Sequence, residues 1–244
     1  MTRRRWIADE VSGDRAALVG EHADHLFRVL RARVGEVFDI AAGQSVRRGR
    51  ITLARADRVE FELGDEIPGA ALAQITLLLA IFKFDRMEWA IEKCTELGVA
   101  RIVPVISRRT DTHLATASAK RAERWLRIAR QAAEQSRRAA PPEIAAPARL
   151  AEVLNPPEGF RVFLAESEEQ TLLRDVLSDE AEGGIILAVG PEGGWTEDEV
   201  QSFQQAKWVS ASLGNTILRA ETAAIAATAV VVSTYFRSEN ATTD

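Results

Sequence analysis

The 244-residue chain lacks several features that would place it in other classes of protein. It has one cysteine, Cys94, which excludes an internal disulfide and a cysteine-rich metal site. It has no run of about 18 apolar residues, so we expect no membrane span. Its first residues, MTRRRWIADE, contain no apolar core, so we expect no secretory signal. Together these absences favour a cytoplasmic protein.

Recognisable ligand motifs are scarce as well. His22 and His113 have no partners in the sequence that suggest a metal site, and we predict no metal. The phosphate-binding patterns GxGxxG and GxxxxGK followed by Ser or Thr are both absent. These absences argue against a phosphate-binding loop and against a zinc site.

Positive charge is in deficit overall, but it is unevenly distributed. The net charge of −5 taken alone argues against a nucleic-acid partner. Residues 101–138, however, hold ten Lys and Arg against three acids, whereas residues 152–199 hold two Arg against thirteen acids. This asymmetry predicts a basic face on an acidic protein.

A stripe of arginines falls within the basic segment. Arg121, Arg124, Arg127 and Arg130 recur at every third position of a predicted helix. For any single arginine a solvated helix face is the favoured interpretation. Because no compensating acids are expected nearby, the cluster as a whole favours contact with phosphates.

Residues 1–69 are predicted to form a small β-rich domain with one helix. Short strand-like segments separated by glycine turns are typical of a small barrel. The segment His22–Arg33 predicts a short amphipathic helix that ends at Gly35. Ile67-Pro68-Gly69 marks the boundary with the second domain.

Residues 70–244 alternate apolar and helical segments, which predicts an α/β domain with a parallel sheet. The predicted strands are Ile75–Phe82, Arg101–Ile106, Phe160–Ala165, Ile185–Val189 and Trp208–Leu213. The predicted helices are Asp85–Leu97, Ala115–Arg138, Leu172–Glu182, one that begins after Thr196, and Arg219–Phe236.

Two glycine-bearing loops near the C-terminal end come after predicted strands. The first is Gly190–Gly194, and the second begins at Gly214. Ligands of open α/β sheets lie beyond the carboxyl ends of strands, so we expect both loops to face one crevice. Thr196 and Glu199 form a capping-box pattern after the first loop, and taken alone this loop is a tight strand-to-helix connection. Glu192 argues against a phosphate ligand here.

The last predicted helix begins with two charged residues of opposite sign. Glu221 complements the helix dipole, whereas Arg219 is a cation at a helix N-terminus and needs another explanation. Trp195 flanks the first glycine loop and is the one tryptophan that we regard as a candidate for base stacking. The other four tryptophans are interpreted as core or interface residues.

Several segments carry the pattern of a known family: His25–Arg31 with Gly35, Glu92–Val99, Glu134–Arg138 with Pro141, and the pair Gly190–Gly194 and Leu213–Ala223. On these motifs the chain resembles, along almost its whole length, the RsmE family. These are S-adenosylmethionine-dependent methyltransferases of the SPOUT (trefoil-knot) superfamily that modify uridine N3 in 16S ribosomal RNA. The chain departs from the family pattern at Cys94, Asn215-Thr216 and Ala220, none of which carries the expected chemistry.

The resemblance implies a fold, a cofactor and partners. Residues 1–69 are expected to be a PUA-like RNA-binding β-barrel, and residues 70–244 a knotted SPOUT-type α/β domain that binds S-adenosylmethionine. The family functions as a homodimer. The expected partner is 16S rRNA, free or within an assembled small ribosomal subunit. A methyltransferase acting on another RNA atom, such as a ribose 2′-hydroxyl, and a non-catalytic RNA-binding protein are the alternatives.

The resemblance also implies site residues. The expected cofactor-binding residues are Leu187, Gly190, Pro191, Glu192, Gly193, Gly194, Leu213, Gly214, Ile217, Leu218 and Arg219. Uracil N3 must lose a proton, so Arg219 is expected to stabilise the oxyanion that develops on the base. Glu221 either removes the proton or only pairs with Arg219, and we weigh these two roles equally. The expected RNA-binding residues are Arg4, Arg28, Arg31, Lys83, Arg137 and Arg138.

Overall fold

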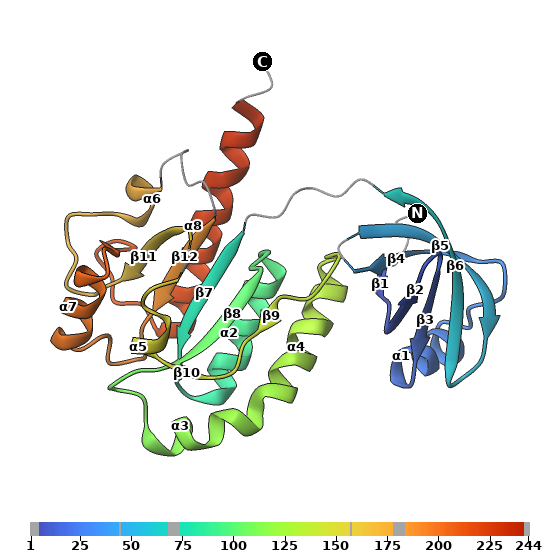
Figure 1. Ribbon diagram of the computed structural model, residues 1–244, viewed down its shortest axis with the longest axis horizontal. Helices are drawn as coiled ribbons and strands as arrows, with labels where there is room; N and C mark the ends of the chain where they lie inside the picture. Colours follow the sequence, from blue (N-terminus) through green and yellow to red (C-terminus); the bar gives the residue numbers. More distant parts are fainter. Residues whose placement is uncertain (1–4, 44, 68–73, 157, 178–183, 242–244) are drawn as a thin grey trace. The chain divides into compact units, whose positions relative to one another are not determined.

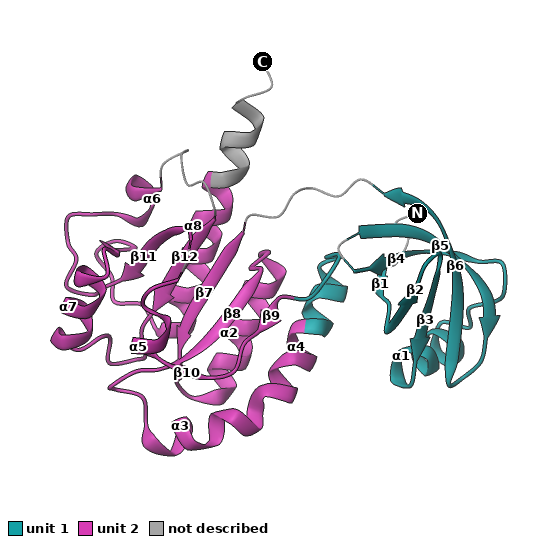
Figure 2. Cartoon of the chain, in the orientation of Figure 1, with its two compact units in different colours: residues 1–71, 130–141 teal, residues 72–129, 142–244 magenta. Residues whose placement is uncertain are grey.

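The computed structural model describes residues 5–43, 45–67, 74–156, 158–177 and 184–241, with the backbone alone for 235–241 (Figure 1). The chain divides into two compact units (Figure 2). The small unit comprises residues 1–71 and 130–141, and the large unit comprises residues 72–129 and 142–244. The predicted division at residue 69 did not include the return of residues 130–141 to the small unit.

The small unit is built on one sheet. In its described part, six strands lie in the order β1-β4-β5-β6-β3-β2, and all neighbours are antiparallel except β1 and β4. The strands are β1 (Arg5–Ile7), β2 (Glu10–Ser12), β3 (Arg15–Val19), β4 (Val37–Ala42), β5 (Ser45–Ala54) and β6 (Arg58–Ile67). Leu18, Leu26, Ile40, Ile51 and Phe61 form its core.

The predicted helix of the small unit is shorter than expected. It consists of α1 (Glu21–Asp24) followed by the π-helix η1 (His25–Val29). Arg31 adopts a left-handed backbone with φ of 53°, so the helix cannot extend to Arg33. A single π-helical turn is a common local distortion at functional sites.

Residues 130–141 belong to the small unit through both apolar and ionic contacts. Ala133 packs with Ile7, Ala41 and Val46. The Arg130 guanidinium lies 2.7 Å from an oxygen of Asp9. These partners are far apart in the sequence, which is why periodicity alone places this segment with the large unit.

The large unit is an α/β fold with a parallel sheet, as predicted. Over its described residues, seven strands form the order β10-β8-β7-β12-β11-β13, with β9 beside β8, and every pair is parallel. The strands are β7 (Ile75–Ala80), β8 (Arg101–Ile106), β9 (Glu143–Ile144), β10 (Ala148–Arg149), β11 (Phe160–Leu164), β12 (Ile185–Val189) and β13 (Val209–Ala211).

The helices of the large unit cover both faces of this sheet. They are α2 (Phe84–Glu96), α3 (Thr112–Ser118), the 3-10 turn η2 (Ala119–Arg121), α4 (Ala122–Gln135), α5 (Leu150–Val153), α6 (Leu173–Val176), α7 (Glu197–Gln205) and α8 (Ala220–Ala241). The end of α4, from residue 130, belongs to the small unit. The predicted helix 115–138 is therefore interrupted, and most of the predicted helix 172–182 lies outside the described residues or is not helical.

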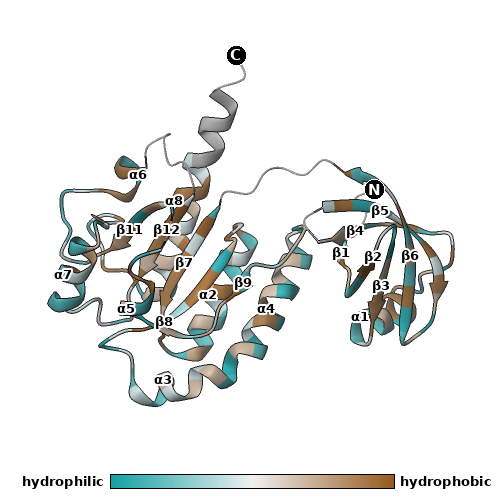
Figure 3. Ribbon diagram, viewed as in Figure 1, coloured by the Kyte–Doolittle hydropathy of each residue, from teal (hydrophilic) through white to brown (hydrophobic). Residues whose placement is uncertain are grey.

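Apart from Thr76, the residues of β7 are hydrophobic, as expected for a strand that is covered on both sides (Figure 3). Leu77 and Leu79 pack into the core on the side of α2 and α8, whereas Leu78 packs into the core on the side of α5 and α7. In the part of the chain that is described, none of the helices combines the length and apolar character that crossing a bilayer requires.

We predict that Cys94 is unreactive in the folded protein. The side chain is fully buried in α2, where its sulfur lies 3.6 Å from the Thr228 hydroxyl of α8. Burial raises the pKa of the Cys94 thiol to about 12, and the thiolate is the reactive form. An aromatic disulfide reagent at about pH 8 should leave the native protein unmodified while the urea-unfolded chain reacts fully. Rapid release of the coloured thiol from native protein would contradict this burial.

Candidate active site

Three strand ends converge on one cavity of the large unit. β12, β11 and β13 are neighbours in the sheet, and the chain leaves each of them at the same edge. The cavity, of about 440 Å³, is lined by Leu164, Ala165, Glu166, Glu168, Glu169, Val189, Gly190, Pro191, Gly194, Ala211, Ser212, Leu213, Gly214, Asn215, Thr216, Ile217, Leu218, Ala220 and Ala223. This volume is within the usual range for small-molecule sites.

The two glycine-bearing loops line this one cavity, as the strand-end argument predicts. Of the residues expected to contact a cofactor, the cavity brings together Gly190, Pro191, Gly194, Leu213, Gly214, Ile217 and Leu218. Their backbone groups and apolar side chains suit a largely uncharged ligand.

Four of the expected cofactor-binding residues do not line the cavity: Leu187, Glu192, Gly193 and Arg219. Leu187 lies inside β12, paired with Leu77 and Val162, and its side chain is wholly buried in the core. Glu192 and Gly193 lie at the exposed tip of the first loop, and Arg219 is exposed at the start of α8. Proximity in sequence to a strand end therefore did not suffice to place these side chains in the cavity.

A third loop, which the sequence did not single out, also lines the cavity. It comes after β11 and contributes Glu166, Glu168 and Glu169. An oxygen of Glu168 accepts hydrogen bonds from the backbone N–H groups of Gln170 and Thr171, at 3.1 and 3.0 Å. These backbone donors lower the pKa of Glu168. The sequence does contain a signal for this loop: polar residues follow a predicted strand here, as they do in the other two loops.

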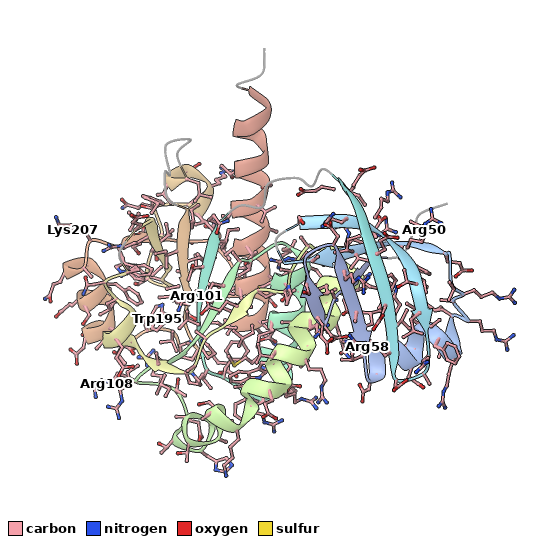
Figure 4. All side chains as sticks on the ribbon, turned by 45° about the vertical axis from the view of Figure 1, so that its right-hand side comes forward. Arg50, Arg58, Arg101, Arg108, Trp195 and Lys207 are labelled. Atoms are coloured by element: carbon pink, nitrogen blue, oxygen red, sulfur yellow. The ribbon has the colours of Figure 1, made fainter. Side chains whose placement is uncertain are left out.

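Close packing explains the glycines of the first loop. The Gly194 N–H donates to the Pro191 carbonyl at 2.8 Å, and Gly194 adopts a φ of 68°. A side chain at Gly190 would come within 3.3 Å of the Trp195 indole. Trp195 is buried and donates to the Leu164 carbonyl at 3.1 Å. The base-stacking role considered for Trp195, which is labelled in Figure 4, is therefore wrong, because its indole is buried against the first glycine loop.

The predicted capping box at the start of α7 is confirmed, and one of its residues also makes a contact outside the helix. Glu199 accepts from the Thr196 N–H at 2.9 Å, and the Thr196 hydroxyl accepts from the Glu199 N–H at 3.3 Å. The other oxygen of Glu199 accepts from the Arg108 backbone N–H at 2.8 Å. The Arg109 side chain donates to the Gly193 carbonyl. The loop after β8 is thus fixed both to the first glycine loop, at Gly193, and to the helix that follows it, at Glu199.

Glu221 is paired, but its partner is not Arg219. The carboxylate is 3% exposed, and its Oε1 lies 3.7 Å from Nε of Arg86, in the first turn of α2. A second nitrogen of Arg86 lies 4.0 Å from Glu192. The Arg219–Glu221 ion pair, one of the two roles considered for Glu221, is therefore not formed, and over the described residues no ion pair of Arg219 is found.

The residues expected to bind RNA fall into different environments. Arg4 lies outside the described residues. Arg28 is exposed and lies 2.8 Å from Asp24, and Arg31 is exposed at its left-handed backbone position. Lys83 is exposed and immediately precedes α2.

Arg137 and Arg138 differ from each other sharply. Arg137 is exposed, and its carbonyl accepts a hydrogen bond from the Arg5 side chain. Arg138 is 7% exposed, and this burial lowers the pKa of its guanidinium to about 10. Such burial does not fit direct contact between Arg138 and a phosphate.

The arginine stripe has more compensating acids than its sequence window shows. Arg121 and Arg124 both lie beside Glu88 of α2, at 3.6 and 2.7 Å. Arg130 pairs with Asp9 and Glu134. The expectation of a free cationic stripe is therefore wrong for three of its four members, because their partners come from other elements.

Comparison with known proteins gives a consistent result. The family model for an RNA methyltransferase domain matches residues 70–232. Ribosomal RNA small subunit methyltransferase E from Synechocystis sp. is 34% identical over 213 residues, which cover 85% of this chain and 69% of that protein. The protein of the same name from Bacillus subtilis is 28% identical over 231 residues, 88% of each. A crystal structure of a ribosomal RNA small subunit methyltransferase E from Neisseria gonorrhoeae bound to S-adenosyl methionine is 32% identical, with a TM-score of 0.83 over 95% of this chain and 98% of that one.

The adjacent glycines of the first loop provide a matched stability test. Gly194→Ala should lower the free energy of unfolding by about 1–2 kcal/mol, because a Cβ is unfavourable at a left-handed φ. Gly193→Ala should cost less than about 0.5 kcal/mol, because its Cβ would press, at 3.2 Å, only on the flexible side chain of Arg109. Urea unfolding of both variants measures the difference, and equal losses would contradict the assignment of strain to Gly194.

Proposed function

This chain belongs to the RNA methyltransferase family, and we propose that it transfers the methyl group of S-adenosylmethionine to N3 of a uridine in small-subunit (16S) ribosomal RNA. The observation that carries the proposal is the cavity at the ends of β11, β12 and β13. It is lined by the motif-bearing loops and lies within the residues that match the family model. A structural relative of this chain binds the same cofactor.

The residues around the cavity fit S-adenosylmethionine. Its adenosyl part needs apolar walls and backbone hydrogen-bonding groups, which the loops of Gly190–Gly194 and Leu213–Leu218 provide. The ligand also carries a positive sulfonium and a positive ammonium group. Glu166, Glu168 and Glu169 supply negative charge on the same cavity wall. When bound, the cofactor supplies an electrophilic methyl group.

Arg219 is assigned to the target base. It is exposed at the start of α8, beside Leu218 and Ala220 of the cavity lining. A guanidinium there can stabilise the negative charge that develops on a uracil oxygen as N3 loses its proton. The burial of Glu221 leaves little of that carboxylate for direct contact with RNA, so we assign the electrostatic role to Arg219 alone.

The finer features of the fold are part of the same proposal. The placement of β12 between β7 and β11 supports a knotted SPOUT-type arrangement of the chain after β11. The mainly antiparallel sheet of the small unit supports a PUA-like barrel that recognises RNA. Its candidate phosphate contacts are Arg28, exposed within the π-helix, and Arg31, exposed just after it. We place the reaction in the cytoplasm, on 16S rRNA that is free or within a small ribosomal subunit.

We also infer a homodimer that uses an apolar groove between α2 and α8. The groove is lined by Trp89, Lys93, Glu96, Leu97, Thr222, Ile225, Ala226 and Ala229. Trp89 is 48% exposed, and large apolar side chains on a surface commonly mark interaction sites. A second copy of the chain is the partner that the family resemblance implies.

Replacing Arg219 tests the catalytic assignment. Arg219→Ala should reduce methylation about 10²- to 10³-fold, because it removes one charged group that stabilises the developing oxyanion. Cofactor affinity should be retained, since Arg219 does not line the cavity. The measurements are calorimetric titration with S-adenosylmethionine and transfer of a labelled methyl group to RNA. Nucleoside mass spectrometry should identify 3-methyluridine as the product.

Arg101→Ala is the control for Arg219, because Arg101 is exposed at the amino end of β8, away from the strand ends that form the cavity. It should retain full activity. Wild-type activity in Arg219→Ala would refute its assigned role, and a 2′-O-methylated nucleoside would refute the target atom.

A substitution in the groove tests the dimer. Trp89→Glu should convert a dimer to monomers, because it places a charge in an apolar contact. Leu126→Glu is the matched control, since Leu126 is 47% exposed on α4 and does not line the groove. Sedimentation velocity measures both variants, and a Trp89→Glu protein that remains dimeric would exclude this interface.

A further inference from the structure

Arg86 occupies a position that helix electrostatics alone disfavours. It lies in the first turn of α2, where a cation opposes the helix dipole. Its side chain is 31% exposed and faces carboxylates from two other elements. One is Glu221 in the first turn of α8, and the other is Glu192 in the loop after β12. These contacts supply the reason for a cation at that helix end.

The orientation of Glu221 is set by its neighbours in α8. Ala220 and Ala223, three positions apart, line the cavity. Residues so spaced share a helix face, and Glu221, about 100° around the helix from Ala220, points elsewhere. It faces Arg86 of α2, and α2 and α8 pack together. Glu221 is therefore part of the wall behind the cavity and not of its lining.

The pairing concerns a carboxylate that has few other partners. Glu221 is 3% exposed, and in the described part of the chain its Oε2 has no hydrogen-bond partner. Arg86 is the charged partner of Glu221, and Glu192 is the other charged group that lies beside Arg86. A buried carboxylate that loses its cation is strongly unfavourable. Arg86 is thus the counter-charge on which the position of Glu221 depends.

We propose that Arg86 is a positioning residue for methyl transfer, which through Glu221 and Glu192 fixes the start of α8 against the first glycine loop. The inference rests on the proposed methyltransferase function. Arg219 lies two residues before Glu221, so a fixed Glu221 also fixes the backbone from which Arg219 extends. Because Arg86 engages Glu221, Arg219 stays available for the target base. Glu221 in this arrangement orients the site and does not remove the proton.

A double-mutant cycle tests the pair, using Arg86→Met, Glu221→Gln and the combination. Each single variant should reduce the rate of a single turnover about 10- to 100-fold, since small displacements at a reacting centre are costly. Cofactor affinity should change little. The double variant should be no worse than the worse single variant, because both substitutions remove the same interaction. Losses that multiply in the double variant would overturn the proposal.

The pH dependence of the rate separates positioning from proton transfer. In Glu221→Gln the whole profile should be lowered with its shape unchanged, because a positioning group does not titrate in the reaction. Loss of one limb of the profile in that variant would show that Glu221 is the base, and would overturn the proposal. Arg86→Lys should restore most of the rate lost in Arg86→Met.

Thermal unfolding provides a measurement that does not depend on activity. Arg86→Met should lower the unfolding midpoint, and adding Glu221→Gln should recover part of that loss, because it removes the unpaired buried charge. If Arg86→Met does not fold, recovery of folding in the double variant supports the pair, and failure of the double variant overturns it. Arg101→Met is the control, since Arg101 forms an exposed pair with Glu143 at 3.3 Å.

The two proposals fail in different ways. Wild-type protein that methylates neither free nor assembled small-subunit RNA refutes the proposed function, while the thermal cycle still reports on Arg86 and Glu221. Additive midpoint changes refute the pair even if the wild-type enzyme is fully active.

Discussion

The position of β12 is the constraint on which the rest of the large unit depends. It is hydrogen-bonded to β7 on one side and β11 on the other, and all of its residues are buried. A strand held on both edges and both faces cannot shift in register without breaking its hydrogen bonds to both neighbours and moving each side chain into the opposite core. The chain must therefore leave it at Gly190, at the edge where β11 and β13 also end. The cavity is therefore formed by the three loops that follow β11, β12 and β13.

Local sequence signals predicted the helices, strands and loops, but not all of the contacts that form between them. Apolar runs such as Ile75–Phe82 and the glycine loops identify strands and their ends, because these signals act over a few residues. The family pattern then predicted the ligand. The loop of Glu166–Glu169 was missed because an acidic run looks like an ordinary solvated surface. The pairing of Arg86 could not be predicted, because its partners, Glu192 and Glu221, lie far along the chain and no local periodicity connects them.

The charged side chains discussed above are mostly paired with residues of other helices or strands, and less often with residues of their own. Glu88 of α2 faces two arginines of the stripe, and Arg86 of the same helix faces Glu221 of α8. Counting charges in a sequence window thus overstates the cationic surface of residues 101–138. What remains for RNA is a smaller set of exposed groups. The exposed pairs contribute little to stability, whereas the buried carboxylate of Glu221 makes its cation indispensable.

The return of residues 130–141 to the small unit has a consequence for biosynthesis. The first six strands emerge from the ribosome well before Ala133, yet Ile7, Ala41 and Val46 share a buried cluster with it. Asp9 likewise cannot form its ion pair with Arg130 until that part of the chain has been synthesised. The small unit is therefore incomplete until more than half of the chain has been made. Each unit is built from two separate segments of the sequence. A cut at any single point in the chain therefore cannot separate one whole unit from the other.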